Sequence, residues 1–455
     1  MNIRIVVLTV VTVAVLLSAA FPSSAAKRPT FIRDAEVENT IRAYAAPLFR
    51  AAGLPPESIR VHLVRDKALN AFVAGGLQMF INTGLLIRAD NPGQIIGVIA
   101  HETGHISGGH LSRTSEALSG ANAATILGVV LGTAAAVSTG RGDLGTAIMM
   151  GGQEMGMRQF LKYSRVQESS ADQAAVKLLD ATGQSARGLM EFMEILVDQE
   201  LVPASSQDPY VRTHPITQTR VDFLREHVSK SPFSDTPMSA DFQRRYARMK
   251  AKLVGFLTSP ARTLRQYPVT DTSLPARYAR AVAYYRRSDV KEALQEIDLL
   301  LADHPLDPYF HELRGQILYE NGRGVEALPS YESAVRLSPP NALLSSILAQ
   351  TRLETGDLEQ ARLAIGDLKI ALRLEPESTF YWSQLGRAYA KDGQMGMATL
   401  AQAEEAYLRG KDSEARFHAG KAIKMLSRNS SSWLRAQDIL YATRPEKDEQ
   451  DPTRP

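Results

Sequence analysis

Short apolar runs in the first half of the chain predict a small β-sheet followed by helices. Three β-prone runs occur early, at Val61–Val64, Ala71–Val73 and Leu77–Asn82, and the pair Gly75-Gly76 between the last two is typical of a hairpin. Asn91-Pro92 then has the signature of a helix start, with asparagine as the N-cap and proline in the first turn. Further helical stretches follow, and no later run is strand-like. The pattern predicts an α+β domain dominated by helices.

A different pattern begins at about residue 275, where the sequence repeats every 34 residues. Ala293, Ala327 and Ala361 lie in matching contexts 34 residues apart, and Pro305 and Pro339 have the same spacing. A helix–turn–helix unit of this length resembles the tetratricopeptide repeat, an all-α solenoid in which each unit buries its apolar face only against its neighbours. The alternative, an irregular helical bundle, does not explain several positions that recur in phase.

The N-terminus has the pattern of an export signal. Arg4 precedes the uncharged apolar run Ile5–Leu17, and Ser24-Ala25-Ala26 offers a cleavage point. The run is shorter than the roughly 20 residues of a membrane-spanning helix, although an uncleaved anchor is the alternative. We therefore expect cleavage near Ala26 and a mature protein in the bacterial periplasm. The full expected organisation is a signal peptide, the helix-dominated α+β domain, a linker, a tetratricopeptide-repeat domain and a disordered tail, at residues 1–26, 27–260, 261–274, 275–441 and 442–455.

Composition limits the chemistry that this chain can perform. It has 455 residues, of which 44% are hydrophobic and 22% charged, as in ordinary folded domains. The formal net charge of +3 is too small to predict nucleic acid as a partner. The absence of cysteine excludes disulfides, thiolate nucleophiles and cysteine-based zinc sites. Any bound metal ion must therefore be held by histidines and carboxylates.

The candidate catalytic motif is His101-Glu102-Thr103-Gly104-His105, in the helix that follows Asn91-Pro92. Residues i and i+4 share one face of a helix, so both imidazoles point the same way and can bind one Zn²⁺. Glu102 projects about 100° round the helix from His101, beside the metal, where a general base for the attacking water has to stand. A five-residue pattern also occurs by chance, but here it lies on an apolar helix of an exported chain. The motif predicts that the α+β domain at residues 27–260 is a zincin-type metallopeptidase with one zinc ion per chain.

A catalytic zinc site needs a third protein ligand, and two residues compete for this role. His110 lies five residues after His105, which on a continuing helix is about 140° away from the ligand face, so we interpret it as a structural or surface residue. Glu168 lies in a second predicted helix, with Asp172 one turn later on the same face. We expect Glu168 to bind the metal and Asp172 to accept the free ring N–H of a ligand histidine. Taken alone, such a carboxylate pair is more often a solvated face.

Together these motifs resemble a known peptidase family. The segments that carry the resemblance lie between residues 70 and 215 and are Asn70–Gly76, Asn82–Leu86, His101–His105, Ser164–Asp172 and Thr213–Pro215. They are similar to the gluzincin family that includes HtpX and the CAAX prenyl proteases. The export signal and the C-terminal tetratricopeptide repeats are most similar to the periplasmic BepA-type branch of that family.

The resemblance implies a role for each candidate site residue. It makes His101, His105 and Glu168 the zinc ligands, Glu102 the catalytic base and Asp172 the hydrogen-bond partner of a ligand. His214, in the family's Thr-His-Pro segment, becomes either a removable fourth ligand or an oxyanion donor. A loop that caps a helix is the alternative for His214.

The resemblance also implies partners. The clients would be unfolded or misassembled outer-membrane proteins, and the repeats would face the outer-membrane barrel-assembly machinery. We further expect an extended substrate to add as a strand along Leu77–Asn82, in contact with Leu77, Met79 and Ile81. The uncharged segment 117–140 is expected to be a buried hairpin over the cleft or a peripheral membrane contact. The rival function is a periplasmic chaperone or adaptor whose zinc site is structural or latent.

Overall fold

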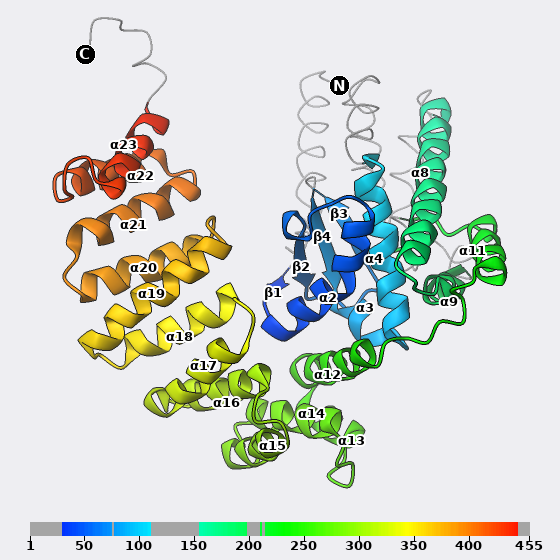
Figure 1. Ribbon diagram of the computed structural model, residues 1–455, viewed down its shortest axis with the longest axis horizontal. Coiled ribbons are helices and arrows are strands. Elements are labelled where there is room, and N and C mark those ends of the chain that lie inside the picture. The colour runs from blue at the N-terminus through cyan, green and yellow to red at the C-terminus, as the bar shows by residue number, and fades with distance from the viewer. Residues whose placement is uncertain (1–29, 75–76, 111–153, 198–209, 212–213, 445–455) are drawn as a thin grey trace, which may run out of the picture. The chain divides into compact units, whose positions relative to one another are not determined.

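The computed structural model describes residues 30–74, 77–110, 154–197, 210–211 and 214–444, except for the side chains of 154–164 (Figure 1). The predicted signal peptide, the uncharged segment 117–140 and residues 445–455 of the predicted tail lie outside this part of the chain. Across the described residues, none of the helices combines the length and the apolar character that crossing a bilayer requires.

The described chain divides into two compact units. The first contains the residues up to Ile32 and Tyr44–Met238, and the second contains Arg33–Ala43 and the residues from Ser239 onward. The division falls within helix α2 (Ala35–Ala51), so that one helix contributes to both units.

The unit boundary differs from the predicted domain boundary at residue 260. Helix α12 (Ala240–Leu257) belongs to the second unit, where it packs against the first repeat helix. The predicted linker 261–274 also differs from the structure, because helix α13 (Pro260–Gln266) occupies its first half. The first difference arises because α12 has a buried face that includes Met249 and Val254, and such a face must pack against a neighbouring element.

The sheet of the first unit has 4 strands in the order β1-β2-β4-β3. The strands are β1 (Phe31–Ile32), β2 (Arg60–Val64), β3 (Ala71–Ala74) and β4 (Gln78–Asn82). β4 is parallel to β2 and antiparallel to β3, which confirms the three predicted runs and the predicted pairing of the last two. β1, which pairs antiparallel to β2, was not predicted.

The prediction of a substrate-binding edge at Leu77–Asn82 is wrong. β4 is hydrogen-bonded to β2 on one side and to β3 on the other, so an added chain cannot pair with it. Met79 and Ile81 have fully buried side chains in the core, and Leu77 lies just before the strand. The sequence pattern identified the strand but not its neighbours, because strand order is a property of the folded sheet.

Helices complete the first unit and carry the predicted catalytic motif. Figure 1 shows α4 and α8 side by side next to the sheet. Besides a 3₁₀ turn at Pro56–Ser58, the helices are α3 (Thr83–Arg88), α4 (Pro92–Ser107), α8 (Glu154–Ala181), α9 (Arg187–Val197) and α11 (Gln218–Lys230).

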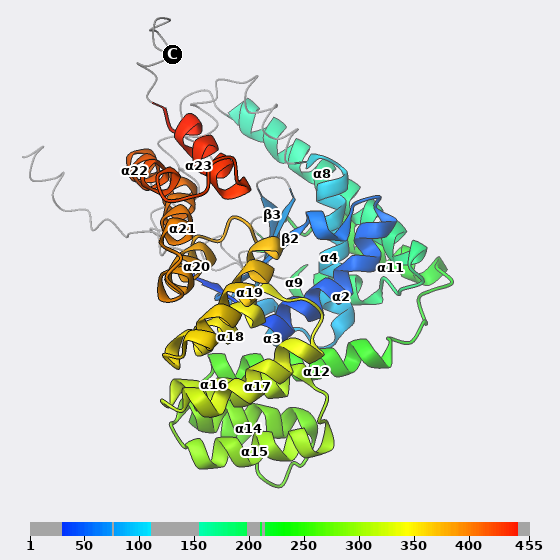
Figure 2. The same ribbon diagram turned by 60° about the vertical axis from the view of Figure 1, so that its left-hand side comes forward.

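The second unit is a stack of helix pairs, as the 34-residue period predicts (Figure 2). Ala293, Ala327 and Ala361, which define the period, are all buried where the helices of a pair meet. After α12 and α13 the helices are α14 (Leu274–Arg286), α15 (Val290–Asp303), α16 (Pro308–Glu320), α17 (Gly324–Leu337), α18 (Ala342–Glu354), α19 (Leu358–Leu374), α20 (Thr379–Lys391), α21 (Met395–Leu408), α22 (Asp412–Ile423) and α23 (Ser431–Ala442).

A buried network of charges joins Arg33–Ala43 to the repeat helices within the second unit. Lys252 Nζ lies 2.8 Å from Asp34 Oδ2 and 3.4 Å from Glu312 Oε2. The Tyr278 hydroxyl donates a 2.6 Å hydrogen bond to Glu36 Oε2. Burial, together with the charges of Asp34 and Glu36, raises the pKa of Glu312 to about 7 although Lys252 opposes the shift.

Candidate metal centre and active site

The helix that carries the HETGH motif has well-defined ends. Asn91 is its N-cap and accepts a 3.2 Å hydrogen bond from the backbone N–H of Gln94, as the Asn91-Pro92 pair predicts. The helix ends at Ser107, so that His101 and His105 occupy its last two turns. Both histidines are buried, with 0% and 7% of their surfaces exposed, and they lie on one face as the i, i+4 spacing predicts.

A close approach of α4 and α8 brings the third candidate ligand to the two histidines. Gly104 lies where the helices meet, and a Cβ atom at this position would be 2.7 Å from the backbone oxygen of Ala171. Glycine is therefore required for this packing. One turn away, the Glu168 carboxylate of α8 lies with Oε2 3.3 Å from His101 Nε2 and Oε1 3.4 Å from His105 Nε2.

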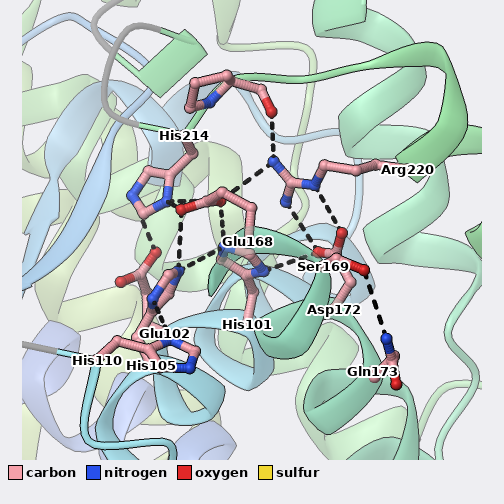
Figure 3. A network of polar contacts seen from close by, with 11 residues as sticks. His101, Glu102, His105, His110, Glu168, Ser169, Asp172, Gln173, His214 and Arg220 are labelled. Carbon is pink, nitrogen blue, oxygen red and sulfur yellow. Dashed lines mark hydrogen bonds and ion pairs between the residues drawn. The ribbon is translucent and has the colours of Figure 1, made fainter. Parts of the chain in front are cut away.

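The spacing of these donor atoms fits a single metal ion. The Nε2 atoms of His101 and His105 are 3.1 Å apart, and His214 Nδ1 lies 3.2 Å from Glu168 Oε2. A tetrahedral Zn²⁺ with bonds of about 2.0–2.1 Å holds its donor atoms about 3.3 Å apart. One ligand atom from each of the four residues lies within 4.8 Å of the others. The three predicted ligands and His214 thus form one buried cluster with the donor set of a zinc site (Figure 3).

Glu102 lies beside this cluster and not within it. Its side chain is fully buried, and neither carboxylate oxygen has a hydrogen-bond partner among the described residues. The closest base is His214, whose Nε2 is 3.5 Å from Glu102 Oε1 (Figure 3). Burial raises the pKa of Glu102, although the nearby His214 and His101 oppose the shift. A buried carboxylate without partners is available to accept a proton.

Asp172 contacts the ring of His101, and Arg220 contacts both carboxylates of α8. His101 Nδ1 lies 2.9 Å from Asp172 Oδ1, which leaves its Nε2 free to face the cluster. Arg220 donates to Asp172 through Nε and Nη2 at 2.6 and 2.9 Å, and its Nη1 lies 3.1 Å from Glu168 Oε2. Although burial opposes the change, Arg220 lowers the pKa of Asp172 to about 2. The sequence contains no signal for this role of Arg220 beyond its position after the Thr-His-Pro segment.

His214 is held in place by an aromatic neighbour and by the residue that follows it. The ring of Tyr210 stacks on that of His214 at 4.6 Å with an interplanar angle of 27°. The carbonyl of Pro215 accepts a 2.7 Å hydrogen bond from Arg220. Tyr210 was not a candidate in the sequence analysis, since a single tyrosine carries no motif.

The remaining histidine of the motif region does not lie where helical spacing puts it. His110 is buried, and its Nδ1 is 3.0 Å from His105 Nδ1. The helical extrapolation that placed it away from the ligand face fails because α4 ends at Ser107. Gly109 then takes a positive φ of 62°, which reverses the chain and brings His110 back to the helix. His110 is therefore not a surface residue.

Comparisons with known proteins agree with this geometry. Residues 32–228 match peptidase family M48, and residues 276–342 match a tetratricopeptide repeat. The first domain of the chain is thus similar to peptidase family M48. The donor atoms of His101, His105 and Glu168, with the Glu102 carboxylate beside them, are groups that suit a metallopeptidase.

Two curated relatives match most of the chain, and a third matches a shorter part of it. A beta-barrel assembly-enhancing protease of Yersinia pestis is 24% identical over 367 residues, which cover 78% of this chain and 72% of the relative. The protein of the same name from Escherichia coli K12 is 24% identical over 378 residues, covering 81% and 74%. The metalloprotease LoiP of Escherichia coli is 27% identical over 175 residues, 38% of this chain and 64% of LoiP. The chain is thus a metallopeptidase that carries tetratricopeptide repeats.

Proposed function

We propose that this chain is a zinc-dependent endopeptidase of the periplasm that degrades unfolded or misassembled proteins. The observation that carries the proposal is the arrangement of His101, His105 and Glu168, whose donor atoms have the spacing of zinc ligands and lie beside the unpartnered carboxylate of Glu102. Export to the periplasm rests on the N-terminal signal pattern.

Each residue of the site has its own role in the proposed reaction. His101, His105 and Glu168 would hold the zinc ion, which when bound lowers the pKa of a water molecule and polarises the scissile carbonyl. Glu102 accepts the proton of the attacking water and returns it to the leaving amine, a role that suits its buried carboxylate without hydrogen-bond partners among the described residues. Asp172 keeps the proton of His101 on Nδ1, so that the Nε2 lone pair faces the ion.

His214 supports a regulated form of this site. Its Nδ1 lies at ligand spacing from Glu168, so His214 would serve as a fourth ligand that has to leave before substrate enters. Its Nε2 has no hydrogen-bond partner among the described residues and lies close to Glu102. A histidine in this position could also donate a hydrogen bond to the oxyanion. The two roles give opposite results in His214→Ala: loss of a blocking ligand increases the cleavage rate, whereas loss of an oxyanion donor decreases it by about 10²–10³-fold.

The edge strand β3 is the better candidate for substrate binding now that β4 is excluded. Its outer side is unpaired among the described strands, and β3 packs against α4, the helix that carries the motif. A substrate chain paired to β3 would be held through its backbone, and its side chains would be read only weakly. Such binding selects extended, unfolded segments over folded ones.

The repeat domain offers a surface for a protein partner. A cavity of about 410 Å³ opens in the second unit, within the size range of ligand pockets. Lys369 and Arg373 lie on its rim, and Arg435 is paired with Glu404 at 2.6 Å. This surplus of positive charge favours a partner with acidic and apolar residues. The apolar residues that line the cavity are Leu372, Trp382, Leu385, Tyr389, Met397, Leu400 and Ala401.

The names of the relatives indicate which partners to test. Two of them are called beta-barrel assembly-enhancing proteases, and we propose by likeness that the clients here are outer-membrane β-barrel proteins and that the repeats bind their assembly machinery.

A second function, a chaperone or adaptor with a latent site, is supported by the fourth donor at His214. One experiment separates the two: full-length protein and its Glu102→Gln variant are incubated with disordered casein, with and without a chelator. Cleavage that the chelator stops and that Glu102→Gln reduces by about 10²–10⁴-fold supports the peptidase. Zinc binding that is equal in both proteins shows that the variant has lost only its base. Suppression of aggregation without cleavage in either protein would support the adaptor.

A further inference from the structure

We propose that His110 is a positioning residue for the metal centre, where its imidazole accepts the Nδ1–H of His105 and holds that ring with Nε2 toward the ion. The inference rests on the proposed zinc site. It adds a residue that lies outside the HETGH motif and makes no contact with the ion.

The geometry of the two rings carries the proposal. His105 has two ring nitrogens with different surroundings: Nε2 faces His101 and Glu168, and Nδ1 lies 3.0 Å from His110 Nδ1. The rings meet edge to face, with centroids 5.0 Å apart and an interplanar angle of 80°. Only 5% of the surface of His110 is exposed, so water is not a ready replacement for it.

The backbone is built to bring His110 to this position. The chain leaves α4 at Ser107 and turns back at Gly109, whose φ is 62°. A Cβ atom on Gly108 would lie 2.5 Å from His110 Nε2, so a residue without a side chain is required there. Gln167 Nε2 donates a 3.1 Å hydrogen bond to the His110 carbonyl, which ties the turn to the residue next to Glu168.

The contact assigns the protons of both rings. To bind a metal through Nε2, a neutral His105 must carry its proton on Nδ1. His110 Nδ1 is then the acceptor, and its own proton is on Nε2. Since a ligand imidazole is oriented by the partner of its second nitrogen, His110 does for His105 what Asp172 does for His101.

The two histidines nevertheless have partners of different charge, a carboxylate for His101 and a neutral imidazole for His105. The charges around the site explain why the partner of His105 is neutral. Three buried carboxylates, those of Glu102, Glu168 and Asp172, already lie around the cluster, and Arg220 compensates only the latter two directly. A fourth carboxylate beside His105 would add uncompensated negative charge to a buried site. A neutral imidazole orients His105 without this cost.

Two isosteric variants of the full-length protein test the role of the acceptor. In His110→Asn the amide oxygen replaces Nδ1 as the hydrogen-bond acceptor. In His110→Leu the side chain has nearly the same shape as asparagine but offers no acceptor. Ser107→Ala, a change at the exposed end of the same helix, is the matched control. Zinc affinity is measured by competition with a fluorescent chelator, and the zinc-free proteins are unfolded with urea to compare their stability.

We expect His110→Leu to bind zinc about 10–100-fold more weakly, and His110→Asn to recover most of that loss. Ser107→Ala should bind zinc like the unsubstituted protein. Unchanged zinc affinity in His110→Leu, or an equal loss in both variants, would overturn the inference, because then the acceptor does not matter. An unsubstituted protein that binds no zinc would refute the proposed function and this inference together.

Discussion

Replacing Gly104 with alanine tests whether the close packing of α4 on α8 builds the metal centre. The new Cβ atom would lie 2.7 Å from the backbone oxygen of Ala171, an atom that cannot move aside as the end of a side chain can. Ordinary contact begins at 3.4 Å, so the two helices must separate locally by about 0.7 Å. Overpacking of this kind costs about 1–3 kcal/mol in the free energy of unfolding.

The separation acts directly on the proposed ligand set, because two of the proposed ligands lie on α4 and the third lies on α8. The distances from Glu168 to His101 Nε2 and His105 Nε2 are 3.3 and 3.4 Å, close to the tetrahedral spacing of about 3.3 Å. An added 0.7 Å would spread these donors beyond the reach of one ion in its preferred geometry. We expect a marked loss of zinc affinity, and a cleavage rate about 100-fold lower, since a displacement of about 1 Å can have this effect.

The assay compares urea unfolding in the presence of a chelator with zinc affinity measured by competition. Gly366→Ala is the matched control, because Gly366 is exposed on α19 and no atom lies within 4 Å of its Cβ position. Alanine there should stabilise the protein by about 0.5–1 kcal/mol and leave zinc affinity unchanged. If Gly104→Ala unfolds and binds zinc like the unsubstituted protein, the packing of these helices does not set the site and the reasoning is refuted.

Two further predictions concern buried charges. Arg220→Met leaves the carboxylates of Asp172 and Glu168 without their common cation, so the zinc-free protein should lose about 3–5 kcal/mol of unfolding free energy in urea titrations; a loss below about 1 kcal/mol would contradict the contacts described. Glu312 has a folded-state pKa of about 7, above the ordinary 4.5, so the folded state binds the Glu312 proton more tightly than the unfolded state does. The protonated Glu312 therefore favours the folded state, and its contribution to the free energy of unfolding decreases as the pH rises from about 4.5 to about 7. Glu312→Gln should remove this decrease and be about 1–3 kcal/mol more stable than the unsubstituted protein at pH 8, as measured by unfolding at several pH values; a parallel pH dependence in both proteins would exclude Glu312 as its source.

Local sequence patterns predicted the parts of the fold that depend on neighbouring residues. The Asn91-Pro92 start of α4, the i, i+4 alignment of His101 and His105, and the 34-residue repeat are all found in the structure. These features follow from helix geometry, capping and periodic burial, which act over one or a few turns.

Predictions from the same rules failed where the chain changes direction and where the position of a strand depends on which other strands pair with it. His110 lies against His105 because the helix ends three residues earlier and Gly109 reverses the chain. β4 is an internal strand because β2 pairs with its other side, which no pattern within Leu77–Asn82 reveals.

The sequence by itself determined the candidate residues and the repeat pattern: a histidine pair with an adjacent glutamate on one helix, a carboxylate pair on a second helix, and a repeated helical array. Only the tertiary structure decided how these groups meet. The close contact at Gly104 sets the distance between the two helices, and Arg220 makes two buried carboxylates tolerable beside each other. Both effects arise from atoms far apart in the chain, and such contacts depend on packing and desolvation in the folded protein, which local sequence rules do not contain.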